Sequence, residues 1–242
     1  MRSAIRLITL SLVASLLGLG TATPATAAVW ESCGTWANWS EGGYNLYNNI
    51  WGSGAGTQCI WANSHSNWGV TADHPATPGV KSYPNSERPN IRTRISGLKT
   101  LTSTFDVTVP SGGAYATAYD IWAGRSYEIM LWVNKQGSVA PWADRYDDFG
   151  NPIPRVSAVS LGGHTWDAFY NGGPRGRHVV SLVRTANANA GTVDILACLQ
   201  WIRNQGWIGD ISIEKVQLGF EISGSPGGMS FTMNDYGVTF SR

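Results

Sequence analysis

Two glutamate residues lie in apolar segments that alternate with the period of a β-strand. In Tyr127–Val133 (YEIMLWV), alternation places Glu128, Met130 and Trp132 on the same face of a sheet. An ionised carboxylate is costly to bury in a core, whereas methionine and tryptophan are unusual choices for a fully solvated face. A concave, partly desolvated ligand cleft suits all three side chains. The competing interpretation is a glutamate at the rim of an ordinary strand.

Glu221 occupies a second segment of this kind, Val216–Ile222 (VQLGFEI). Alternation places it on the face of Gln217 and Gly219, and the small Gly219 is expected to leave room for a bulky ligand. The chain has only six glutamates, so two in such contexts are informative. Two carboxyl groups flanking a cleft suit glycoside hydrolysis, in which one stays ionised at the anomeric carbon and the other keeps a proton for the leaving oxygen.

Asp120 is a candidate third carboxyl group, in the apolar segment Ala118–Trp122 (AYDIW). It could hold Glu128 by sharing a proton with it. The alternative is an aspartate that caps a turn or faces solvent.

The segment from Asn49 to Trp51 combines an amide and an indole. If it alternates as a strand does, both side chains share a face, where the indole could stack on a sugar ring and the amide could bind hydroxyl groups. Tryptophan in a hydrophobic core is the competing interpretation. The four histidines show no metal-ligand spacing, so no metal site is predicted. There is also no G-x-S-x-G motif for a serine nucleophile.

The elements that must position these residues are short strands separated by Gly, Pro, Asn and Ser, which is typical of an all-β sandwich or barrel. The candidate strands span residues 44–50, 57–62, 69–71, 98–109, 114–122, 127–134, 156–161, 164–170, 178–183, 211–221 and 228–240. Only Val193–Asn204 has helical spacing, with Asp194 in the first turn and Gly206 after the end.

The N-terminus has the pattern of a secretory signal peptide: a basic start, an apolar run from Leu7 to Leu19, and small residues at 25–28. Residues 1–28 are therefore predicted to be a signal peptide and 29–242 a single domain. The protein is expected to be secreted and extracellular, with no membrane-spanning helix.

Net charge and composition limit the classes of molecule that this protein is expected to bind. The formal net charge is +1 for the whole chain and −1 without Arg2 and Arg6, which argues against nucleic acid or an anionic membrane as a partner. The 12 tryptophans, 29 glycines and 14% charged residues suit a neutral polysaccharide. Of the three cysteines, Cys33 and Cys59 are expected to form a disulfide because both lie in the N-terminal β-rich region, with Cys198 as a buried free thiol.

Five motifs in this order resemble glycoside hydrolase family 12, and the resemblance covers nearly the whole chain after the predicted signal peptide. They are NNIWG (Asn48–Gly52), KSYPN (Lys81–Asn85), AYDIW (Ala118–Trp122), EIMLW (Glu128–Trp132) and GFE (Gly219–Glu221). The resemblance implies a concanavalin-like β-jelly roll of two curved antiparallel sheets, with one short helix, and substrate across the concave face.

The resemblance also implies the roles of the site residues. Glu128 matches the nucleophile of an endo-acting, retaining enzyme, Glu221 the acid/base, and Asp120 the acid that supports the nucleophile. Asn49 and Trp51 match a glucosyl-binding pair, and Cys33–Cys59 matches the family disulfide. The expected substrate is a β-1,4-glucan, either cellulose, mixed-linkage glucan or xyloglucan, and no cofactor is needed.

Two positions depart from the family pattern. Glu221 is followed by Ile222-Ser223 without a rim aromatic, and Trp142 stands in the loop after the Glu128 strand where a smaller residue is common. Met130, Trp132 and Trp142 are predicted to contact substrate, and a monomer is expected. The main alternative function is a carbohydrate-binding lectin on the same sandwich fold.

Overall fold

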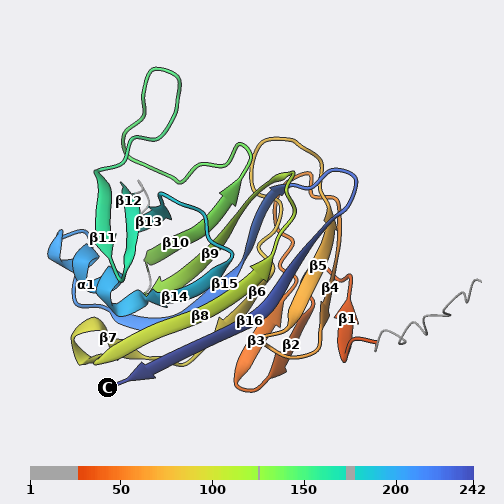
Figure 1. Ribbon diagram of the computed structural model, residues 1–242, viewed down its shortest axis with the longest axis horizontal. Coiled ribbons are helices and arrows are strands. Elements are labelled where there is room, and N and C mark those ends of the chain that lie inside the picture. The colour runs from red at the N-terminus through yellow and green to blue at the C-terminus, as the bar shows by residue number, and fades with distance from the viewer. Residues whose placement is uncertain (1–26, 125, 173–177) are drawn as a thin grey trace, which may run out of the picture.

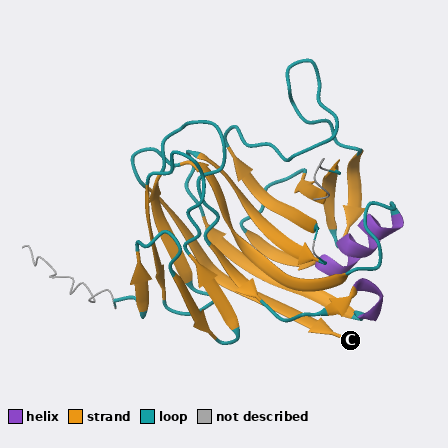
Figure 2. Ribbon diagram, turned by 180° about the vertical axis from the view of Figure 1, so that it is seen from behind, coloured by secondary structure: helices purple, strands orange, loops and turns teal. Residues whose placement is uncertain are grey.

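A computed structural model describes residues 27–124, 126–172 and 178–242. It consists of two stacked, curved β-sheets (Figures 1 and 2). The predicted all-β jelly roll is confirmed. The predicted signal peptide covers residues 1–28, of which 1–26 lie outside the described residues.

The smaller sheet has six strands. Their order is β1 (Trp30–Ser32), β4 (Thr57–Ala62), β5 (Trp68–Asp73), β16 (Met229–Ser241), β8 (Thr100–Thr108) and β14 (Ala190–Asp194).

The larger sheet has ten strands and carries the site residues. Nine follow one another in the order β11 (Val156–Leu161), β12 (His164–Asn171), β13 (His178–Arg184), β10 (Tyr127–Gln136), β9 (Ala114–Ala123), β15 (Ser212–Gly224), β6 (Asn85–Arg88), β3 (Tyr44–Tyr47) and β2 (Asn38–Glu41). The tenth, β7 (Thr93–Arg94), pairs with β15. The expected antiparallel pairing holds except between β10 and β13, which run parallel.

The hydrophobic core lies between the two sheets. On β10, Ile129, Leu131 and Val133 are fully buried in it, so the intervening side chains point to the other face of the larger sheet. Met130 and Trp132 belong instead to a second apolar cluster on that other face. The face of the larger sheet that is turned away from the core is therefore itself partly apolar.

The one α-helix in the described ranges is α1 (Ile195–Asn204), accompanied by the short 3₁₀ helix η1 (Ile95–Gly97). The sequence predicts a helix from Val193, but residues 193 and 194 end strand β14. Asp194 is the N-cap: its side chain accepts a hydrogen bond from the Ala197 backbone N at 2.9 Å. Cys198, on this helix, is a buried free thiol as predicted, and burial raises its pKa to about 12.

Five strands were not predicted from the alternation of apolar residues, namely β1, β2, β6, β7 and β14. Strand β6 (NSER) has no apolar residue, and its backbone is a strand because β3 and β15 pair with it on either side. Pairing partners far along the chain therefore impose the extended conformation that its own composition does not favour.

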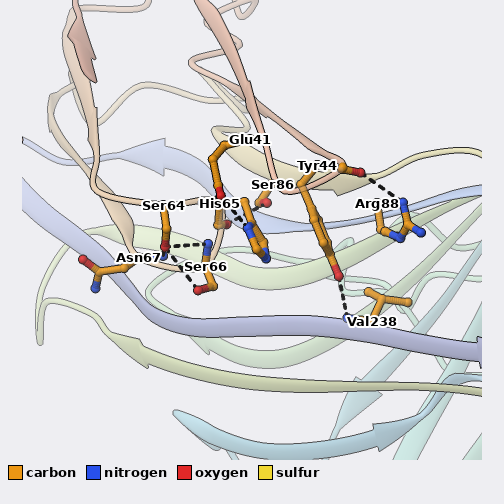
Figure 3. Close-up of polar contacts among 10 residues, drawn as sticks. Glu41, Tyr44, Ser64, His65, Ser66, Asn67, Ser86, Arg88 and Val238 are labelled. Carbon is orange, nitrogen blue, oxygen red and sulfur yellow. Dashed lines mark hydrogen bonds and ion pairs between the residues drawn. The ribbon is translucent and has the colours of Figure 1, made fainter. Parts of the chain in front are cut away.

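A polar cluster joins the edge of the larger sheet to the smaller one (Figure 3). Tyr44 on β3 lies on the ring of His65, with 4.1 Å between ring centroids, and its hydroxyl accepts a hydrogen bond from the Val238 backbone N on β16. Glu41 contacts His65 Nδ1 at 2.7 Å, and Ser86 Oγ donates to the His65 carbonyl oxygen. These contacts fix the β2–β3 hairpin against the turn between β4 and β5.

The predicted disulfide between Cys33 and Cys59 is present and closes a loop with a sequence separation of 26. We expect the Cys33→Ser, Cys59→Ser double variant to lose about 2–4 kcal/mol of unfolding free energy, because the unfolded chain regains the freedom that the cross-link removes. Guanidinium denaturation measures this loss. Dithiothreitol should destabilise the native protein by a similar amount and leave the double variant unchanged; an unchanged midpoint in the variant would contradict the expectation.

Candidate active site

Glu128, Asp120 and Glu221 lie on three neighbouring strands, with β9 between β10 and β15. On β9, Asp120 pairs with Met130 of β10 and with Gln217 of β15. Glu128 pairs with Trp122, whereas Glu221 pairs with Ala116, so the two glutamates lie diagonally on either side of β9.

All three carboxyl groups share the outer face of the larger sheet. Glu128 alternates with the core residue Ile129, and Glu221 lies between the fully buried core residues Phe220 and Ile222. The side chains of both glutamates are therefore directed away from the core. The burial pattern of β10 confirms the prediction that Glu128, Met130 and Trp132 share one face of the sheet.

The charges of these residues act on one another. Burial, and then the negative charge of Glu128, raise the pKa of Glu221 to about 7. Glu221 therefore keeps its proton to a higher pH than an ordinary glutamic acid. The two glutamates are close enough to affect each other's ionisation, although different segments of the chain carry them.

The charges of all three carboxyl groups act on Tyr83. Its pKa is raised well above the usual value, first by burial and then by the charges of Asp120, Glu221 and Glu128, among others. Its hydroxyl donates to the carbonyl oxygen of Ala118 on β9 at 2.9 Å. Tyr83 belongs to the KSYPN motif, which is its only signal in the sequence, and no role was predicted for it.

A cavity of about 470 Å³ opens beside Glu221. Its walls include Trp51, Trp132 and Trp142, which come from three separate segments. Trp132 is only 3% exposed, and its Nε1 has no hydrogen-bond partner within the described ranges, whereas Trp51 and Trp142 are 53% and 65% exposed. Solvent-facing indoles around a carboxyl group provide flat apolar surfaces of the kind that bind sugar rings.

The backbone that places Trp51 at the cavity has a different conformation from the predicted one. The residues from Asn49 to Trp51 do not alternate as a strand: β3 ends at Tyr47, and Asn49 has a positive φ of 47°. Asn49 Nδ2 donates to the Tyr83 carbonyl oxygen, and Trp51 N donates to the Lys81 carbonyl oxygen. The prediction that Asn49 and Trp51 share a face through strand alternation was therefore wrong, although Trp51 does line the cavity.

The Lys81 backbone connects the Trp51 segment to the Glu221 strand. Lys81 N donates to the Ile222 carbonyl oxygen at 2.8 Å, and the Lys81 carbonyl oxygen accepts from Gly52 N at 2.8 Å. A Cβ on Gly52 would lie 1.9 Å from the Val80 carbonyl oxygen, so only glycine permits this approach. Trp51 is thereby held at a set position relative to Glu221.

Gly219 also has a different role from the expected one. A Cβ at this position would lie 2.0 Å from the Pro84 carbonyl oxygen and 2.7 Å from Asn85 Cβ. The missing side chain accommodates the neighbouring backbone, so the idea that it leaves room for a ligand was wrong.

On the Glu128 side, a second polar network lies on the same sheet face. Glu87, only 5% exposed on β6, contacts Lys215 Nζ at 2.8 Å and accepts from Gln217 Nε2 at 2.8 Å. Gln217 Oε1 in turn accepts from the indole Nε1 of Trp122 at 2.9 Å. This network was not predicted, because Glu87 lies in a strand without an apolar pattern.

A curved β-sandwich with interacting carboxyl groups on one sheet face, and exposed tryptophans around the cavity beside them, is the arrangement of a glycan-cleaving enzyme of the jelly-roll class. The family model for glycosyl hydrolase family 12 matches residues 42–241. The chain belongs to this family, and it is a glycosidase.

Relatives and solved structures support the assignment. A xyloglucan-specific endo-β-1,4-glucanase A of Emericella nidulans is 28% identical over 93% of this chain and 99% of its own. The xyloglucanase domain of NopAA, a type three effector from Sinorhizobium fredii solved with cellobiose, is 42% identical, with a TM-score of 0.85 over 88% of this chain and 100% of that domain. The endoglucanase Cel12A of Rhodothermus marinus has a TM-score of 0.77 at 25% identity, over 88% and 99%.

None of the helices in the described ranges is long and apolar enough to cross a membrane.

Proposed function

We propose that this chain is an endo-acting, retaining β-1,4-glucanase with Glu128 as nucleophile and Glu221 as acid/base. The observation that carries the proposal is the pairing of Glu221, whose pKa is raised to about 7, with the charge of Glu128 on the same sheet face. A protonated acid beside an ionised carboxylate is what the first step of glycoside hydrolysis requires.

The reaction has two displacements. Glu128 attacks the anomeric carbon while Glu221 gives its proton to the departing glycosidic oxygen, so that a covalent glycosyl-enzyme forms and one saccharide leaves. Glu221, now ionised, takes a proton from water, and the resulting hydroxide displaces Glu128 from the anomeric carbon. Two inversions retain the configuration, and no metal or organic cofactor takes part.

The remaining residues bind and position the glucan. Asp120, which lies two residue pairs from Glu128 along the β9–β10 ladder and so on the same face, supports the nucleophile. Trp51 and Trp142 stack on sugar rings at the cavity, and Trp132 offers its Nε1 as a donor. Asn49 orients a sugar hydroxyl, and Met130 provides apolar contact beside the carboxyl groups.

Xyloglucan is the substrate to test first, because relatives with this specificity, from Emericella nidulans and Sinorhizobium fredii, match over most of their length. Initial rates of reducing-end release should be compared on xyloglucan, mixed-linkage β-glucan and carboxymethylcellulose. Proton NMR during hydrolysis should show the β-anomer first. Binding without release of reducing ends would favour the lectin alternative, and initial α-anomer would exclude the two-step reaction.

The pH dependence should follow the ionisation of Glu221. Because the acid must be protonated, kcat/KM is expected to fall as pH rises through about 7, where this group loses its proton. In Glu128→Gln the negative neighbour is gone, so the pKa of Glu221 should fall. Carbon-13 NMR titration of the carboxyl groups measures both values; an unchanged Glu221 pKa in that variant would contradict the assigned coupling.

We also propose that residues 29–242 form the mature enzyme, a secreted monomer that acts outside the cell. The N-terminal pattern of residues 1–28 and the Cys33–Cys59 disulfide support export, because disulfides persist in oxidising compartments. N-terminal sequencing of the protein recovered from culture medium, with sedimentation analysis, tests this.

A further inference from the structure

The loop between β10 and β11 extends well beyond the strands at one end of the molecule (Figures 1 and 2). Seven large hydrophobic side chains are exposed in the described part of the chain, and four of them lie in or beside this loop. They are Trp142, Tyr146, Phe149 and Ile153. Phe149 is 91% exposed, so its ring is covered by nothing in the fold. Residues 143–155 are called the arm below.

The tip of the arm is ordered by one aspartate. Asp147 Oδ1 accepts hydrogen bonds from the backbone N of Phe149 and of Asn151, at 3.0 and 2.8 Å, and Oδ2 accepts from Asn151 Nδ2 at 2.9 Å. These bonds lower the pKa of Asp147. The hydrogen bonds to Asp147 hold the Phe149 backbone in one conformation. Less conformational entropy is therefore lost when a ligand binds to the ring.

The foot of the arm is anchored to the sandwich. Arg155 Nε donates to Asp144 Oδ2 at 3.0 Å, and the Arg155 guanidinium lies 4.4 Å from the ring centroid of Tyr170 on β12. Between foot and tip, Ile153 N donates to the Arg145 carbonyl oxygen at 2.9 Å. The arm is therefore a supported projection at a defined position.

The arm is continuous with the site. Trp142, the residue before the arm, lines the cavity that contains Glu221, so one wall of that cavity leads directly into the arm. Asp144, Asp147 and Asp148 are nearly balanced by Arg145 and Arg155, which gives no strong charge for an anionic surface. An uncharged polymer with apolar faces is the partner that matches an exposed ring on a nearly neutral loop.

We propose that the arm is a second glycan-binding site, at which the Phe149 ring stacks on a pyranose of the same β-glucan chain, beyond the sugars held in the cavity. This proposal rests on the glucanase function proposed above. It implies that long substrates gain binding energy from the arm, whereas an oligosaccharide confined to the cavity does not.

The test compares Phe149→Ala, Phe149→Tyr and Asp148→Ala on polymeric xyloglucan and on a short aryl cello-oligosaccharide. Phe149→Ala should lower kcat/KM about three- to tenfold on the polymer, mainly through KM, and less than about twofold on the oligosaccharide. Phe149→Tyr keeps a ring and should retain the native value. Asp148→Ala, the neighbouring exposed position without a ring, should change neither substrate.

Equal losses on both substrates, no loss on the polymer, or a loss in Phe149→Tyr as large as in Phe149→Ala would overturn the proposal. Sedimentation that shows a dimer for the native protein and a monomer for Phe149→Ala would overturn it too, because the ring would then join two copies.

If the proposed glucanase function is wrong, the native protein will cleave neither substrate, and this outcome separates that failure from a failure of the arm proposal. Affinity electrophoresis in gels that contain xyloglucan still measures the arm in that case. Native protein and Asp148→Ala should be retarded equally, and Phe149→Ala should be retarded less; equal retardation of all three would refute the arm as a glycan site.

Discussion

Glu128→Gln is expected to lower kcat on β-glucan by about 10⁴-fold or more, because an amide cannot form the ester link to the anomeric carbon. Glutamine has nearly the same shape, so binding of cello-oligosaccharides should stay within about threefold of native. Initial-rate kinetics and calorimetry measure these two quantities separately. The combination of lost turnover and retained affinity distinguishes a reacting group from a residue that only binds.

Glu214→Gln is the matched control, since it removes a carboxylate from the same strand as Glu221 and leaves the backbone carbonyl of Glu214, which accepts from Ile91 N at 3.1 Å, in place. It should leave kcat unchanged. A direct test uses a 2-deoxy-2-fluoro cello-oligosaccharide with a good leaving group, which should trap the covalent intermediate. Mass spectrometry should then find the label on the peptide with Glu128. A label on another residue, or near-native turnover by Glu128→Gln, would exclude the proposed nucleophile.

Glu221→Ala is expected to lower kcat on polymeric substrate by about 10²- to 10⁴-fold, because the departing alkoxide no longer receives a proton. The loss should depend on the leaving group. A 2,4-dinitrophenyl glycoside departs as a stable anion, so the first step should proceed at a near-native rate and the glycosyl-enzyme should accumulate, visible as a burst of phenolate.

Added azide should then restore turnover of the dinitrophenyl substrate, since azide is a nucleophile that needs no general base, and the product should be a β-glycosyl azide. The same addition should not accelerate Glu128→Gln. If Glu221→Ala lost activity equally on activated and unactivated substrates, and azide had no effect, Glu221 would not be the acid/base.

Much of the local structure could be predicted from alternation and turn residues. Strands β9, β10 and β15 were predicted because apolar residues at every second position face the core, and the intervening positions then carry Asp120, Glu128 and Glu221. The helix was predicted to within two residues because its apolar spacing and its Asp194 cap are local features. The Cys33–Cys59 pairing was also predicted, as both cysteines lie in one short N-terminal region.

Other features depend on contacts between distant segments. Strand β6 has a polar sequence and becomes a strand only through pairing with β3 and β15, so Glu87 and its network had no local signal. The residues from Asn49 to Trp51 were predicted to alternate as a strand does, whereas the backbone of Lys81, bonded to Ile222, decides where Trp51 lies. The exposure of Phe149 at the tip of an ordered arm depends on hydrogen bonds within a loop that showed no periodicity.

By itself, therefore, the sequence determined which residues point away from the core of each strand, because side-chain direction follows from the backbone period of two. Only the tertiary structure decided that the charge of Glu128 acts on Glu221, since the order of the strands places β9 alone between the two segments that carry them. The raised pKa of Glu221 likewise arises from burial by segments distant in the chain, and no local pattern of residues encodes it.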